Sequence, residues 1–72
     1  METINHRLRV DRSEINYLRV TLESYDGMAL VRTLDPRAAV IEVRISPGCE
    51  PLVLELLNDL RDREGIYIEE TQ

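Results

Sequence analysis

The chain has 72 residues, a net charge of −5 and one cysteine, which excludes a disulfide framework and a cysteine-rich metal site. All nine basic residues are arginines, so chemistry that needs a lysine amine is excluded as well. The length predicts a single domain, 1–72, whose core is small enough that self-association is a common source of added stability. Because no apolar segment reaches membrane-spanning length and no signal-peptide pattern is present, we expect a cytoplasmic protein.

The charge is unevenly distributed along the chain. Residues 1–46 contain seven arginines and seven acids, whereas residues 47–72 contain two arginines and seven acids. The last third therefore accounts for the whole net charge. An acidic chain repels phosphate backbones unless its basic groups lie together, so the composition disfavours a nucleic-acid partner.

Alternating apolar and polar residues predict strands in the first part of the chain. Residues 4–11 alternate weakly and are expected to form a short edge strand. Residues 15–23 alternate clearly, with Leu18, Val20 and Leu22 on one side and mostly polar residues on the other. This pattern predicts a second strand with one buried face.

Two turn signals follow. Asp26-Gly27 favours a tight hairpin turn, because glycine adopts positive φ without strain. Residues 28–34 are then apolar on both faces and are predicted to form a third strand. The alternative is a short helix over residues 27–34, which would lack a cap and be too short to be stable alone. Asp35-Pro36 favours a second turn, and residues 40–45 alternate again as a fourth strand.

The hydrophobic pattern predicts a register for the strands over 28–34 and 40–45. On one face, apolar residues and a threonine are paired as follows: Thr33 with Ile41, Val31 with Val43, and Ala29 with Ile45. The same register sets Arg32 opposite Glu42, a favourable cross-strand charge pair. A shift by one residue would place Val31 against Glu42, which the pattern excludes.

The last third predicts one amphipathic helix and a final strand. Pro51 suits the first turn of a helix, and Gly65 suits its left-handed end. Five apolar residues form a stripe wide enough to cover a sheet: Leu52, Val53, Leu56, Leu57 and Leu60. Residues 66–68 are then predicted to form a last strand parallel to 40–45, with both isoleucines inward, followed by a polar tail over 69–72.

The predicted fold is α+β: an antiparallel β-meander with one C-terminal amphipathic helix packed on one sheet face and a final strand. A single helix covers one face, so the other is expected to be a mixed apolar and charged surface, which is typical of an interface. We assign six residues to it: Tyr17, Arg19, Met28, Leu30, Arg32 and Leu34. In the alternative interpretation, arginine stems lie over the apolar side chains and keep this face soluble.

Residues that could support catalysis are few. Cys49 precedes the helix but has no resolving cysteine, so we expect an ordinary thiol. His6, the only histidine, has no serine in a nucleophile elbow to act on. Asp26 and Asp35 are explained as turn residues. We therefore expect a protein that is not an enzyme, with no catalytic residues, no cofactor and no metal.

Five arginines could line one face of the sheet and bind RNA: Arg7, Arg9, Arg19, Arg32 and Arg44. Sheet surfaces that bind RNA stack its bases on aromatic side chains. The chain has no phenylalanine or tryptophan, and Tyr17 is the one aromatic residue expected on that face. The sequence therefore disfavours this function.

The segment 23–35, ESYDGMALVRTLD, resembles a family of short bacterial proteins catalogued only as a domain of unknown function. The similar residues are Glu23, Asp26-Gly27, Val31-Arg32-Thr33 and Asp35, within a similar region of about residues 15–60. The resemblance implies no activity. In outline the predicted fold is also similar to a reduced form of the ferredoxin-like regulatory domains that bind amino acids. It lacks their first helix, so their ligand site is not carried over.

These observations predict a non-enzymatic interaction or regulatory module that forms a homodimer through the uncovered sheet face. A protein partner or a small effector would bind the same face. The alternative is a sensor domain that binds a small anion, an amino acid or an organic acid, at Arg32.

Overall fold

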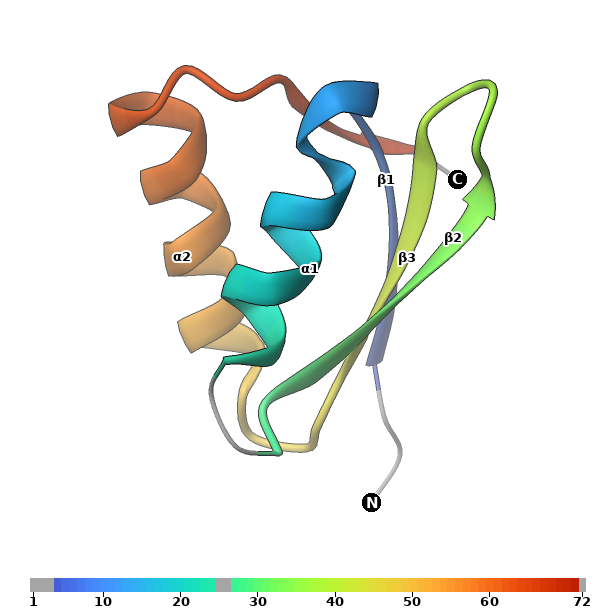
Figure 1. The fold of residues 1–72 in the computed structure, drawn as a ribbon. Coiled ribbons are helices and arrows are strands. Elements are labelled where there is room, and N and C mark those ends of the chain that lie inside the picture. Colours follow the sequence, from blue (N-terminus) through green and yellow to red (C-terminus); the bar gives the residue numbers. More distant parts are fainter. Residues whose placement is uncertain (1–3, 25–26, 72) are drawn as a thin grey trace.

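The computed structural model describes residues 4–24 and 27–71, which form one sheet and two α-helices. Figure 1 shows both helices on the same side of the sheet. The elements in chain order are β1 (Ile4–Val10), the short 3₁₀ turn η1 (Arg12–Glu14), α1 (Ile15–Glu23), β2 (Ala29–Asp35), β3 (Val40–Ile45), α2 (Glu50–Arg63) and β4 (Ile68–Thr71). The predicted α+β class with a C-terminal helix is therefore confirmed.

The sheet has four strands in the order β2-β3-β1-β4, and each neighbouring pair is antiparallel. The strand β1 lies inside the sheet, between β3 and β4. Its prediction as an edge strand was wrong, because β1 is hydrogen-bonded to β3 on one side and to β4 on the other. The order also shows that the sheet is not a simple meander, since only β2 and β3 are neighbours in both sequence and space.

The largest departure from the prediction is α1. Residues 15–23 form an α-helix and not a strand. Leu18 and Leu22 are fully buried, whereas Val20, predicted on the same buried side, is 59% exposed. Leu18 and Leu22 are four residues apart and therefore share one face of a helix. The sheet consequently has four strands instead of five, and two helices instead of one cover it.

The predicted register of β2 and β3 is confirmed. Val31 lies opposite Val43 and Arg32 lies opposite Glu42, where a guanidinium nitrogen is 3.5 Å from the carboxylate. The alternative helix over residues 27–34 was wrong. At the end of β2, Asp35 Oδ1 accepts hydrogen bonds from the backbone N–H groups of residues 37 and 38, at 3.0 and 3.1 Å. Asp35 is therefore a turn residue, as predicted.

The predicted Asp26-Gly27 turn does not join two strands, because it follows a helix. Asp26 lies outside the described residues. Gly27 has a positive φ of 71°, a conformation that glycine adopts without strain. Gly27 therefore allows the chain to turn between α1 and β2.

The helix α2 agrees with the prediction, but its buried stripe is narrower. Pro51 lies in its first turn, and Gly65 has a φ of 65° just past its end. The core-facing residues are Val53, Leu57 and Leu60. Leu56 is half-buried, and Leu52 is 59% exposed, because α1 occupies part of the sheet face that α2 was expected to cover alone.

The strand β4 ends at Thr71. Residues 69–71, which were predicted to belong to a polar tail, are therefore part of a strand. Ile66 and Ile68 are both buried, as predicted. The strand pairs with β1 and consequently runs in the same direction as β3, although β1 separates the two.

The core lies between the helices and the sheet and is entirely hydrophobic among the described residues. The largest fully buried side chains are Leu8, Leu18, Leu22, Ile41, Ile45, Leu60, Val43 and Val53. Within residues 4–24 and 27–71, neither helix has the length and apolar composition needed to cross a membrane.

Candidate functional site

The side of the sheet that faces away from both helices is the candidate site. We call it the open face. Directly paired residues of antiparallel strands share a face, so the strand registers define its members. They are Asn5, Arg7 and Arg9 of β1, Leu30, Arg32 and Asp35 of β2, Val40, Glu42 and Arg44 of β3, and Glu69 and Thr71 of β4.

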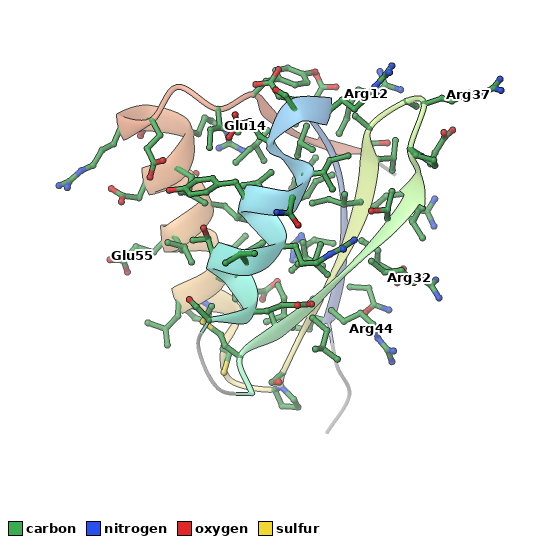
Figure 2. The ribbon with its side chains drawn as sticks, in the orientation of Figure 1. Arg12, Glu14, Arg32, Arg37, Arg44 and Glu55 are labelled. Carbon is green, nitrogen blue, oxygen red and sulfur yellow. The ribbon has the colours of Figure 1, made fainter. Side chains whose placement is uncertain are left out.

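The open face carries four arginines and three carboxylates. Arg32 is close to Glu42, at 3.5 Å. The other three arginines, Arg7, Arg9 and Arg44, form no ion pair with the carboxylates that the structure describes. In Figure 2, Arg32 and Arg44 project away from the helices. This face is therefore positively charged, although the chain as a whole is acidic.

The charged residues lie in rows across the strands. Arg7 lies opposite Glu42 of β3 and Thr71 of β4. Together with Asn5 they line a shallow hollow of about 310 Å³. At the next row, Arg9 lies opposite Glu69. Because neighbouring strands are about 4.8 Å apart, all of these charges fall within the reach of one extended peptide.

Three of the six predicted interface residues belong to other parts of the molecule. Tyr17 and Arg19 lie on α1, on the far side of the sheet, because the segment that carries them is a helix. Met28 is buried. Leu30 and Arg32 lie on the open face, and Leu30 is 63% exposed.

Leu34 is half-buried, at the irregularity between Thr33 and Asp35. Of the five arginines predicted to share a face, all but Arg19 do so. The Arg19 guanidinium instead donates a hydrogen bond to Thr33 Oγ1, at 3.1 Å. The arginine pattern was therefore a better guide to the open face than the six residues assigned to the interface.

His6 lies on the helix side of β1, in a cluster that the sequence did not predict. Its Nε2 is 2.8 Å from a carboxylate oxygen of Glu50, and its Nδ1 is 2.6 Å from one of Glu70. An imidazole that donates from both nitrogens is protonated. The hydrogen bond with Glu50 is the largest cause of a raised His6 pKa, and Glu70 contributes further against the lowering effect of burial.

This cluster joins three elements, since Glu50 begins α2 and Glu70 belongs to β4. The two carboxylates lie at opposite nitrogens of the ring, so they do not converge on one ion. In the part of the chain that the structure describes, no group of acidic, histidine and cysteine residues is arranged to hold a metal. Cys49, the neighbour of Glu50, is a half-buried free thiol packed against the core.

A second hollow, of about 550 Å³, is lined by residues of α2 and by Met28, which lies between α1 and β2. We call it the helix groove. Met28, Leu52 and Leu56 provide its apolar surface, and its rim carries acidic residues of α2: Glu55, Asp59 and Asp62. Asp59 is paired with Arg63, at 2.9 Å. Figure 2 shows Glu55 projecting from α2 on the opposite side of the molecule from the labelled arginines.

A hydrogen bond joins α1 to the residue that follows α2. The Tyr17 hydroxyl donates to a carboxylate oxygen of Glu64, at 2.8 Å. This bond and the nearby negative charge raise the pKa of Tyr17. The open face and the helix groove are thus two distinct surfaces of opposite charge.

Comparison with known families identifies one match. The model of a family described as a domain of unknown function (DUF4911) matches residues 8–63. The chain belongs to the DUF4911 family. Neither a curated protein nor a solved structure matches it. The matched region runs from within β1 to the end of α2, so β4 lies outside it.

Three of the residues that carry the sequence resemblance, Glu23, Gly27 and Asp35, have structural roles. Glu23 accepts a hydrogen bond from the backbone N–H of Val31, at 2.8 Å. Gly27 and Asp35 shape the turns on either side of β2. Because these residues hold β2 in place, the chemistry of the molecule is better sought in the exposed charges of the two surfaces.

Proposed function

We propose that the protein is a non-enzymatic interaction module of the cytoplasm whose open face binds an acidic segment of a protein partner. The observation that supports this function is the group of three arginines, Arg7, Arg9 and Arg44, that lack counter-ions among the described residues. Arginine binds carboxylates through two parallel hydrogen bonds.

The spacing of the arginines suits an extended acidic segment. Arg7 and Arg9 are two residues apart on one strand, so their backbones are separated by about 7 Å. Carboxylates at alternate positions of an extended peptide have the same repeat. The long arginine side chains on the neighbouring strand, such as Arg44, add contacts across the direction of β1.

The predicted homodimer through two open faces is less favourable on electrostatic grounds. Such a contact would bring the four arginines of one open face against the four of the other, with three carboxylates on each, and buried charges without partners cost several kcal/mol each. A nucleic acid is disfavoured because the defined open face holds no aromatic side chain on which bases could stack. The β-α-β-β-α-β order is also that of ferredoxin-like domains, whose first helix, expected from the sequence to be lacking, is present as α1.

A small organic anion is a second candidate ligand, supported by the hollow at Asn5, Arg7, Glu42 and Thr71. The guanidinium group of Arg7 would bind a carboxylate there, and Asn5 offers an amide donor. The volume of about 310 Å³ suits a molecule of amino-acid size. This site is adjacent to Arg32, where the sequence predicted an anion.

The test is fluorescence anisotropy with a labelled peptide that carries glutamates at alternate positions, compared with a lysine peptide of the same length. We expect the acidic peptide to bind and its affinity to fall with added salt. Arg44→Glu should weaken binding by at least about tenfold, since a like charge replaces a favourable one.

The matched control is Arg63→Glu, which changes the net charge equally but lies on α2. The affinity of this variant for the acidic peptide should stay within about twofold of the wild-type affinity. Equal losses in the two variants, or no binding by the wild type, would overturn the proposal. If citrate or an amino acid raises the thermal midpoint while the peptide does not bind, the second candidate is correct.

A further inference from the structure

We infer that the acidic partner of the open face is the helix groove of a second copy of this chain, so that copies associate head to tail. This inference rests on the proposed function, because it names the partner of the same arginine surface. Both surfaces are present on one molecule and face opposite ways, as the labelled residues in Figure 2 show. One copy therefore cannot satisfy its own open face.

The apolar features of the two surfaces are complementary. Leu30 is 63% exposed near the start of the edge strand β2, beside charged residues of the open face. The helix groove presents Met28, Leu52 and Leu56 around a hollow of about 550 Å³, with Leu52 59% exposed. Inserting the Leu30 side chain into this hollow removes apolar surface from water on both copies, which favours association.

The charges around these apolar residues also match. Leu30 is flanked by Arg32, two residues further on β2, and by Arg44, directly opposite on β3. The groove is flanked by Glu55 and Asp62, which form no ion pair within the described parts of the chain. By contrast, Asp59 already has Arg63 as its partner, so it is less available.

The spacing of the two charge pairs is compatible. Glu55 and Asp62 are seven residues apart on a helix, a rise of about 10 Å. Arg32 and Arg44 are diagonal neighbours on paired strands, with backbones about 7–8 Å apart, and their long side chains can spread to the larger separation. Arginine on one copy can therefore reach a carboxylate at each end of the groove on the next.

A contact between two different surfaces leaves one open face and one groove unused at the ends of every assembly. This property distinguishes it from a two-fold dimer. The assembly is expected to grow with protein concentration and to dissociate as salt screens the charges. Its affinity is expected to be modest, because the ion pairs lie at the rim of a small apolar contact.

The test uses two variants that each disable one surface. Arg44→Glu disables the open face, and the double substitution Glu55→Arg with Asp62→Arg disables the helix groove. Circular dichroism first establishes that both are folded. By sedimentation equilibrium at an ionic strength of about 10 mM, where screening is weak, the wild type should exceed the mass of a dimer as its concentration rises. Each variant alone should associate at least about tenfold more weakly.

An equimolar mixture of the two variants provides the decisive measurement. Each variant retains one intact surface, so the mixture should form a heterodimer and grow no further. A wild type that stays monomeric, or that stops at a dimer, would overturn the inference, as would a mixture of variants that stays monomeric.

The groove variant also separates the inference from the proposed function, because its open face is intact. If it binds the acidic glutamate peptide while the wild type does not self-associate, the proposed function is correct and the partner is not a second copy. If it binds no peptide and the wild type does not self-associate, both proposals are wrong.

Discussion

The carboxylate of Glu23, at the end of α1, accepts a hydrogen bond of 2.8 Å from the backbone N–H of Val31 in the edge strand β2. Val31 pairs with Val43 on its inner side, and this N–H points outward from the sheet. An unpaired edge donor is a point at which another chain can add a strand. Glu23 therefore both ties α1 to β2 and closes the edge of the sheet.

Glu23→Ala is expected to lower the free energy of unfolding by about 1.5 kcal/mol, the contribution of a hydrogen bond to a charged group. It should also increase aggregation on heating, because the edge donor is no longer occupied. Urea denaturation and light scattering measure the two effects. Glu23→Gln keeps an acceptor oxygen, so its free energy of unfolding should fall by no more than half as much as that of Glu23→Ala. Equal losses in both variants would contradict a role for the hydrogen bond itself.

The His6 cluster is expected to make stability depend on pH. The pKa of His6 is raised in the folded protein above its ordinary value of 6.5, mainly by Glu50. The folded state therefore binds the proton more tightly than the unfolded state. The contribution of the cluster is complete below pH 6.5 and is lost as the pH rises through the folded pKa.

The measurement is the free energy of unfolding of wild type and His6→Gln across pH 5.5 to 9. The difference between them should shrink with rising pH, and the glutamine variant should lack this dependence. His6 is the only histidine, so its ring resonances report the folded pKa directly by nuclear magnetic resonance. A midpoint at or below 6.5 would contradict the two contacts with Glu50 and Glu70.

Two leucines of α2 that the sequence placed in one stripe are expected to differ in their effect on stability. Leu57 is 3% exposed, whereas Leu52 is 59% exposed. Leu57→Ala should cost about 3 kcal/mol, as buried leucines do, which is a large share of the stability of so small a domain. Leu52→Ala should cost less than about 0.5 kcal/mol. Chemical denaturation of both variants checks this, and a similar loss in the two would place Leu52 in the core.

Among the elements, the β2–β3 pair could be predicted in detail and α1 could not. The strands β2 and β3 are joined by a short turn with Asp35-Pro36, and one register alone buries their apolar residues together. In residues 15–23, Leu18, Val20 and Leu22 alternate as in a strand. However, Leu18 and Leu22 also have helical spacing. Nine residues do not separate the two periods, and packing against the sheet decides between them.

The candidate site was predictable to the extent that it depended on local alternation. Arg7 and Arg9 alternate with buried residues of β1, and Arg32 and Arg44 alternate with those of β2 and β3. Arg19 was misplaced because it belongs to the helix α1. The His6 contacts were beyond sequence reasoning, since Glu50 and Glu70 are 44 and 64 residues away. No local pattern reports on such a distant contact.

The strand order β2-β3-β1-β4 has a consequence for the path of folding. The β2–β3 hairpin closes a short loop and can form within microseconds, whereas β1 must find two partners that are distant along the chain. Closing those long loops has an entropic cost before any apolar surface is buried. We therefore expect the hairpin, with α1 tied to it through Glu23, to form the folding nucleus and the docking of β1 to set the rate.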